Sequence, residues 1–157
     1  MQPAPGTFTQ TTSRRTLLAG ATALLVVHST PVAADPAEMR EAIRAAVGDA
    51  PLSEGRVHLD IPALVENGNS VPLTIRVDSP MTHADHVTSI YVFSPENPLP
   101  SVSRFILGPR NGLAEVKTTI RLATTQILHV VATMSDGSRC LATTEIEVTT
   151  AACFDPT

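Results

Sequence analysis

From Arg56 onward the apolar residues recur at every second position, and this alternation constrains the fold more than any other feature of the chain. A strand places successive side chains on opposite faces, so a period of two predicts strands with one buried face. No helical pattern lies between the segments to connect parallel strands. The sequence therefore predicts an all-β, immunoglobulin-like antiparallel sandwich of about seven strands. These strands are expected at residues 57–61, 71–77, 87–93, 102–107, 114–122, 126–134 and 140–148.

Two segments stand out from the simple alternation. Residues 87–93 are apolar on both faces and are expected at the centre of a sheet, and residues 126–134 are expected to be nearly fully buried. The chain has no Trp, one Tyr and four Phe, so aliphatic side chains must build the core. Hydrophobic residues make up 43% of the 157 residues, which suits one folded domain.

A helical pattern precedes the strands. Asp35 can cap the helix, Pro36 suits its first position, and Gly48 is a suitable stop. The prediction is a short amphipathic helix that covers one end of the body. Its apolar stripe consists of Met39, Ile43, Ala46 and Val47.

The N-terminal residues resemble an export signal. A twin-arginine pattern, Arg14-Arg15, precedes an apolar run over residues 17–27, which is too short to span a bilayer. Small residues at 32–34 offer a cleavage site. We interpret residues 1–34 as a Tat signal peptide, with a Sec signal as the alternative, and both predict a periplasmic protein. Cleavage would change the net charge from −4 to −6, and with no basic run this argues against a nucleic-acid partner.

The chain has two cysteines, and their spacing argues against a disulfide between them. Cys140 begins the last predicted strand and Cys153 follows its end, so a straight strand separates them by roughly 40 Å. A disulfide needs Cα atoms within about 7 Å. We therefore expect Cys140 in the core or at an edge, and Cys153 free on an arm formed by residues 151–157. An intermolecular disulfide or an incidental thiol remains open for Cys153.

Catalytic constellations are not apparent in the sequence. No Lys, Arg or His lies within ten residues of Cys153, and Asp155 disfavours a thiolate. With the ordinary cysteine pKa near 8.5, about 3% of the thiol would be ionised at pH 7. Without a nucleophile–His–Asp arrangement, a phosphate loop or a Cys-x-x-Cys motif, we predict a protein that is not an enzyme and needs no cofactor.

The histidines give a weak metal signal. Residues 83–86, His-Ala-Asp-His, are more readily interpreted as a solvated turn than as a metal site, because structural sites need four fixed ligands. His58 and His129 fall in predicted strands and are expected to be sheet residues.

Five stretches carry a recognisable pattern: VENGNSVP at 65–72, VDSPMT at 77–82, VFSPENP at 92–98, IRLATTQ at 120–126 and MSDGS at 134–138. In this order and spacing they resemble the SoxY family, the sulfur carriers of bacterial thiosulfate oxidation. The resemblance implies an immunoglobulin-like sandwich, residues 35–150, that pairs with a SoxZ-like sandwich as a heterodimer. It also implies that Cys153 carries a sulfur intermediate covalently and presents it to periplasmic redox enzymes.

The arm departs from the family's Gly-Gly-Cys-Gly-Gly and is similar to SoxY-related paralogues with an Ala-Ala-Cys arm. Here Ala151 and Ala152 precede Cys153, and Phe154 and Asp155 follow it. Glycines give backbone freedom, whereas alanines restrict φ and Phe154 adds bulk beside the thiol. The resemblance therefore does not imply that this arm fits the enzymes that accept the glycine arm.

Two further functions stay open beside covalent carriage. One is a non-carrying interaction module that docks to a redox enzyme or a SoxZ-like subunit, with the tail packed through Phe154. The other, weaker one is metal delivery through His83, His86 and Cys153.

Overall fold

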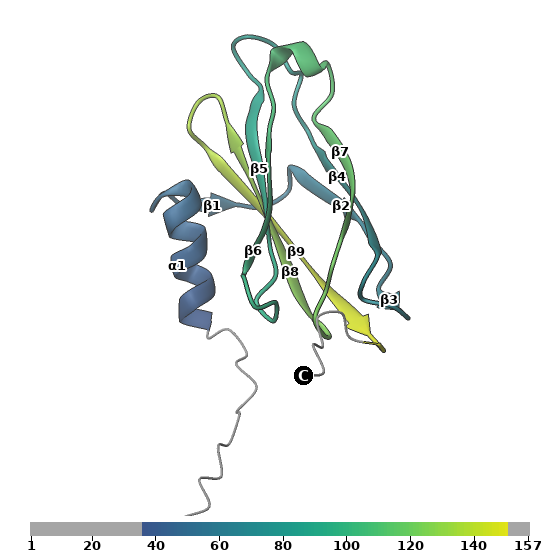
Figure 1. The fold of residues 1–157 in the computed structure, drawn as a ribbon. Helices are drawn as coiled ribbons and strands as arrows, with labels where there is room; N and C mark the ends of the chain where they lie inside the picture. Colours follow the sequence, from purple (N-terminus) through teal and green to yellow (C-terminus); the bar gives the residue numbers. More distant parts are fainter. Residues whose placement is uncertain (1–35, 151–157) are drawn as a thin grey trace, which may run out of the picture. The chain divides into compact units, whose positions relative to one another are not determined.

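The structure is a computed structural model that describes residues 36–150. One helix precedes a set of strands, which Figure 1 labels in chain order. The elements are α1 (Pro36–Val47), β1 (Leu52–Ser53), β2 (Val57–Asp60), β3 (Leu64–Val65), β4 (Val71–Val77), β5 (Val87–Phe93), β6 (Ser101–Ile106), the 3₁₀ turn η1 (Pro109–Asn111), β7 (Glu115–Ile120), β8 (Gln126–Met134) and β9 (Arg139–Val148).

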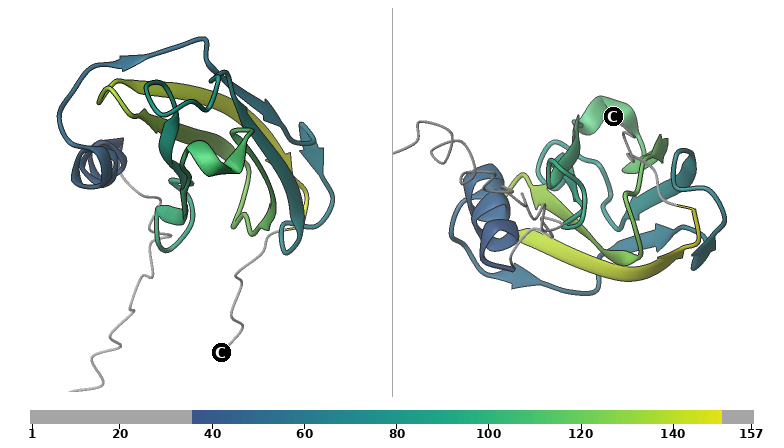
Figure 2. Two further views of the ribbon diagram at one scale, coloured as in Figure 1. Left: turned by 90° about the horizontal axis from the view of Figure 1, so that it is seen from above. Right: turned by 60° about the horizontal axis from the view of Figure 1, so that its bottom comes forward.

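The strands form two sheets that face each other (Figures 1 and 2). The larger sheet has the order β1-β9-β8-β5-β6, and β3 adds to the far part of β9. The smaller sheet has the order β2-β4-β7. All long strands pair antiparallel, while the two-residue strands β1 and β3 pair parallel with β9. The predicted sandwich is confirmed, and β5 lies inside the larger sheet as expected. β8 is buried along most of its length, as predicted, although Ile127 is 49% exposed.

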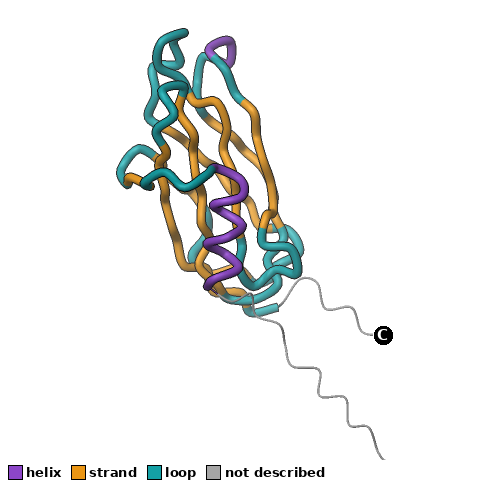
Figure 3. Tube along the Cα trace, turned by 90° about the vertical axis from the view of Figure 1, so that its left-hand side faces the viewer, coloured by secondary structure: helices purple, strands orange, loops and turns teal. Residues whose placement is uncertain are grey.

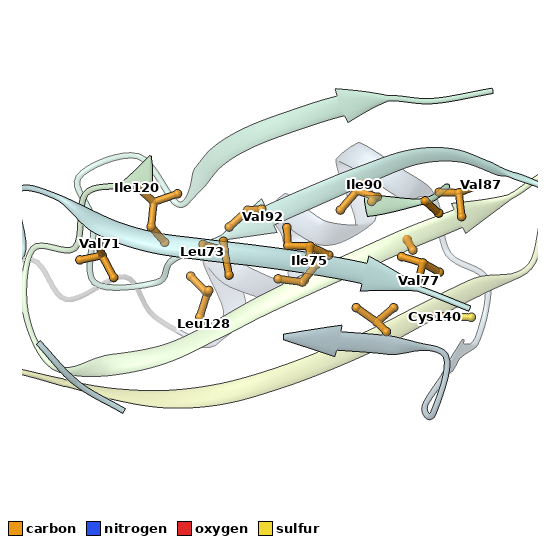
Figure 4. Packing of buried hydrophobic residues seen from close by; sticks show 14 of the residues in the cluster. Val71, Leu73, Ile75, Val77, Val87, Ile90, Val92, Ile120, Leu128 and Cys140 are labelled. Atoms are coloured by element: carbon orange, nitrogen blue, oxygen red, sulfur yellow. The ribbon is translucent and has the colours of Figure 1, made fainter. Parts of the chain in front are cut away.

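The core between the sheets is aliphatic. On β4 the side chains of Val71, Leu73, Ile75 and Val77 are buried, and exposed or half-buried residues alternate with them. They pack against side chains of the larger sheet such as Val92 and Leu128 (Figure 4). Each fully buried side chain of this size contributes about 1.5–3 kcal/mol relative to leaving it in water.

Cys140 belongs to this core. Its side chain is 1% exposed, and its thiol is free, as the sequence predicted. Sγ lies 3.5 Å from the Ser53 hydroxyl on the short strand β1, which pairs with the start of β9.

Helix α1 covers the outer face of the larger sheet rather than an end of the body, so that part of the prediction was wrong (Figure 3). The sequence showed the apolar stripe but not its target. Met39 and Val47 of the stripe are buried against Tyr91, Phe93 and Val131. This packing explains why β5 is apolar on both faces. Gly48 ends the helix at φ +78°, as predicted.

Within residues 36–150 no helix is both long and apolar enough to cross a membrane.

Candidate functional site

The predicted carrier residue lies just outside the part of the chain that the structure describes. Cys153 and the flanking arm residues Ala151, Ala152, Phe154 and Asp155 all follow Thr150, the last described residue. The structure does show the place from which they depart. We call residues 148–150, at the end of β9, the arm root.

The arm root is bonded to β3 and the turn after it. The Thr149 amide donates to the Val65 carbonyl at 3.0 Å, and the Thr149 hydroxyl donates to the Glu66 carbonyl at 3.1 Å. The Gly68 amide donates to the Thr150 carbonyl at 2.9 Å. Backbone bonding therefore continues beyond β9 and fixes the chain as far as Thr150.

The loop between β7 and β8 holds the arm root from the other side. The Val148 amide donates to the Thr125 hydroxyl at 2.9 Å. The Leu122 amide donates to the Gly68 carbonyl at 2.9 Å, so the same glycine joins the arm root and the β7–β8 loop. Both loops lie with the end of β9 at the lower end of the body in Figure 1.

A buried glutamine ties the β5–β6 loop to this end. Gln126 is 5% exposed, and its Oε1 accepts hydrogen bonds from the fully buried Ser94 hydroxyl at 2.5 Å and from the Glu96 amide at 3.2 Å. Its Nε2 donates to the Thr124 carbonyl at 3.1 Å. The buried polar group is thus satisfied on both sides, as stable interiors require.

Asn97 makes the second tie between the same loops. Its Oδ1 accepts from the Ala123 amide at 2.8 Å, and its Nδ2 donates to the Arg121 carbonyl at 2.8 Å. The amide side chain therefore acts as a clamp between the β5–β6 and β7–β8 loops.

Beside this clamp lies an open groove of about 440 Å³ between the edge strands β6 and β7. Residues 97–99, 101–103 and 119–121 contribute its lining, and we call it the β6–β7 groove. Leu99 in this lining is 77% exposed, and Arg121 precedes Leu122, whose amide donates to the Gly68 carbonyl. Sequence reasoning did not identify this groove, because it arises between strands from different sheets.

The candidate metal residues lie in a turn before β5. Asp85 forms an ion pair with Arg56 at 3.6 Å, and Nδ1 of His86 donates to the Thr82 carbonyl at 3.0 Å. His83 is exposed. Among residues 36–150 no group of three or more His, Cys, Asp or Glu side chains is arranged to hold a metal ion.

The remaining two histidines of the described residues lie in strands, as predicted. His58 on β2 contacts Asp78, with Nε2 2.8 Å from Oδ2. His129 on β8 is half-buried, and this burial lowers its pKa, although a hydrogen bond to the Ile127 carbonyl partly opposes the shift.

Three of the stretches that resemble SoxY are joined by hydrogen bonds at this end of the body. Residues 65–72 supply the bonds to Thr149 and Thr150, and residues 92–98 and 120–126 contain Asn97 and Gln126. The sequence named these stretches without showing that they are neighbours. Only the fold shows that these stretches lie together at one end of the sandwich.

Fold and site together define a class: a small sandwich domain whose candidate reactive residue follows the last strand instead of lying in the sandwich. Comparison with known proteins identifies the family of this domain. The family model of the sulfur oxidation protein SoxY matches residues 43–153, which ends on Cys153. The chain belongs to the SoxY family.

Solved structures agree with this assignment. The sulfur carrier protein SoxY from Chlorobium limicola f thiosulfatophilum is 31% identical, with a TM-score of 0.62, and the match covers 73% of this chain and 98% of that one. No protein among the curated sequences matches.

More distant structures share the fold alone. A superoxide reductase (neelaredoxin) from Ignicoccus hospitalis is 18% identical over 60% of this chain and 80% of that one, with a TM-score of 0.52. A superoxide reductase from Nanoarchaeum equitans is 10% identical over 61% of this chain and all of that one, with a TM-score of 0.51. A shared sandwich does not transfer an activity.

Proposed function

We propose that this SoxY-family protein is a periplasmic carrier that holds a sulfur-containing intermediate covalently on Cys153 and presents it to partner redox enzymes. A SoxZ-like sandwich subunit would complete a heterodimer, and the protein itself would supply no catalysis. The family match, which runs through Cys153, and the sulfur-carrier description of the Chlorobium limicola relative support this proposal.

The anchored arm root is the observation that carries the proposal. Cys153 is only three residues beyond Thr150, and three residues of extended chain cover about 10 Å. Because Thr150 is hydrogen-bonded to the body, the thiol is restricted to the surroundings of one end of the sandwich. Cys140 cannot take this role, because its side chain is 1% exposed within the core.

The chemistry of loading sets a requirement on the partner. Joining the Cys153 sulfur to a second thiolate sulfur forms an S–S bond and releases two electrons, and the thiol also loses its proton. An electron acceptor must take these electrons, so loading by this route needs a redox enzyme. Transfer by exchange with an existing S–S bond needs no net oxidation, because one S–S bond breaks as the other forms.

Intact-mass spectrometry tests the proposal directly. The protein is purified from its native host during sulfur oxidation and measured before and after reductant, together with Cys153→Ser and Cys140→Ala variants whose folding is checked by circular dichroism. We expect a reductant-sensitive adduct with masses spaced by sulfur atoms in the parent and in Cys140→Ala, and none in Cys153→Ser. A bare thiol in the parent under these conditions would refute carriage.

The interaction module is the second candidate, and the exposed apolar side chains Leu99, Ile106 and Leu113 favour it. In that case Cys153→Ala leaves partner binding unchanged, whereas Phe154→Ala weakens it. Pull-down of the redox partner with these two variants separates the module from the carrier.

Export is tested separately from carriage. Replacing both Arg14 and Arg15 by Lys should retain the precursor in the cytoplasm if the signal is of the twin-arginine type. Normal processing of this variant would favour a Sec signal.

A further inference from the structure

The β6–β7 groove is open because two strand edges border it. β6 pairs only with β5, and β7 pairs only with β4, so each strand has a free edge among residues 36–150. The two edges belong to different sheets, and the space between their lower ends is the groove. An extended peptide segment is the natural occupant of such a gap, because it can satisfy free backbone groups while its side chains fill the space.

The lining of the groove includes three large apolar side chains. Leu99, Val102 and Ile120 line it, and Leu99 is 77% exposed. An exposed leucine beside an open groove gains stability when an apolar side chain covers it. The groove therefore suits a segment that carries one bulky apolar residue.

The groove lies within reach of the arm root. The Thr150 carbonyl bonds to the Gly68 amide, and the Gly68 carbonyl bonds to the Leu122 amide, each at 2.9 Å. With one residue between these two bonds, the Thr150 carbonyl is within about 10 Å of Leu122, which adjoins Arg121 of the groove lining. Four extended residues from Thr150 to Phe154 cover about 13 Å.

The charges of arm and groove are also complementary. Residues 151–157 contain Asp155 and no cation. Arg121 is exposed and forms no ion pair with any residue in the described range 36–150. An ion pair between the Asp155 carboxylate and this guanidinium would be favourable, although its contribution to the free energy is modest at a solvated site.

We propose that residues 151–157 dock in the β6–β7 groove of their own sandwich, with Phe154 against Leu99 and Ile120 and with Asp155 beside Arg121. The docked arm is a resting state in which the Cys153 thiol is covered until a partner competes for the arm. This inference rests on the proposed carrier function and deepens it: Phe154 and Asp155, absent from a glycine arm, are the residues that hold the resting state.

Nuclear magnetic resonance of the unloaded protein tests docking without any cargo. Amide shifts of the parent are compared with those of Phe154→Ala and of a chain that ends at Thr150. We expect both changes to shift the amides of residues 97–103 and 119–121, independently of protein concentration. Shifts limited to the neighbours of the arm root would overturn the proposal. Groove shifts that grow with concentration would overturn it in favour of an arm from a second copy.

Thiol reactivity provides the second measurement. The alkylation rate of Cys153 is followed by mass spectrometry for Leu99→Asp and for the matched control Leu113→Asp, which changes an equally exposed leucine, 72% exposed, outside the groove. If the docked state exceeds the undocked one by tenfold, its loss speeds alkylation about tenfold. We expect this increase for Leu99→Asp and no change for Leu113→Asp. Equal rates in the parent and both variants would refute a protective docked state.

Charge reversal adds a discriminating case. Arg121→Glu places a negative charge near the arm, which by itself disfavours the thiolate and slows alkylation. Docking predicts the opposite, a faster reaction, relative to the control Arg110→Glu outside the groove. A slower reaction in Arg121→Glu would contradict docking. The carrier function would not be affected by that result, because the mass-spectrometric search for an adduct on Cys153 tests it independently.

Discussion

Replacing Gln126 with Leu would test whether the buried amide network sets the structure of the arm-bearing end. Gln126 links Ser94 and Glu96 in the β5–β6 loop with Thr124 in the β7–β8 loop. A leucine of similar volume keeps the packing and removes these hydrogen bonds. The change therefore isolates the polar contribution.

The magnitude follows from the groups that lose their partners. The Ser94 hydroxyl is 0% exposed and would keep no acceptor, and the partly buried Glu96 amide would also lose its acceptor. Each buried unsatisfied group costs about 1–3 kcal/mol, so the two groups together should lower the free energy of unfolding of Gln126→Leu by about 2–6 kcal/mol. Ser94→Ala removes the donor but leaves Gln126 bonded to Glu96, and should cost about 1 kcal/mol.

Urea unfolding followed by circular dichroism measures these differences, together with the Ser94→Ala/Gln126→Leu double variant. Because the double variant no longer contains the orphaned hydroxyl, its loss should be smaller than the sum of the single losses by about 1–2 kcal/mol. Additive losses, or a Gln126→Leu cost below about 1 kcal/mol, would show that the network does not hold these loops.

Other substitutions probe the helix end, the core and a titrating histidine. Burial lowers the pKa of His129, so as pH falls through the ordinary histidine value of 6.5 the unfolded chain binds a proton before the folded one does. The free energy of unfolding should therefore decline on acidification in this pH range. In pH-dependent urea unfolding, His129→Gln should show a weaker decline than the control His83→Gln. Gly48→Ala should lower the melting temperature by a shift equivalent to about 1 kcal/mol, since a Cβ is strained at φ +78°; an unchanged temperature would contradict this reasoning. In urea unfolding, Leu128→Ala should cost about 2–5 kcal/mol, whereas Ile127→Ala, its half-exposed neighbour, should cost clearly less.

The sequence predicted most of the fold because its strands are half-buried. The alternation of Val71, Leu73, Ile75 and Val77 with polar residues appears in the structure as alternating burial. Strands β1 and β3 were not predicted, since two residues carry no periodicity. The position of α1 was missed because an amphipathic stripe shows that a helix packs without showing against what.

For the site, the sequence offered one candidate reactive residue, which no described residue tests. Cys153 follows from its position in the chain, and its role remains a prediction because it lies beyond the described residues. Gln126 was assigned to a nearly buried strand, but no local sequence pattern predicts that its side chain bonds to loops from distant parts of the sequence. The β6–β7 groove depends on the topology of two sheets, which spacing along the chain does not encode.

The short distance between Thr150 and Cys153 has a consequence for any partner. An arm whose thiol reaches only about 10 Å from a fixed root cannot enter a deep active site unless the end of the sandwich comes with it. If the proposed carrier function holds, the loops at this end of the body, residues 66–70 and 121–125 with 94–100 bonded to the latter, would contact each partner enzyme at the moment of transfer. Partner choice would be determined by these loops as much as by the residues beside the thiol, because a partner that excludes the loops also excludes the sulfur.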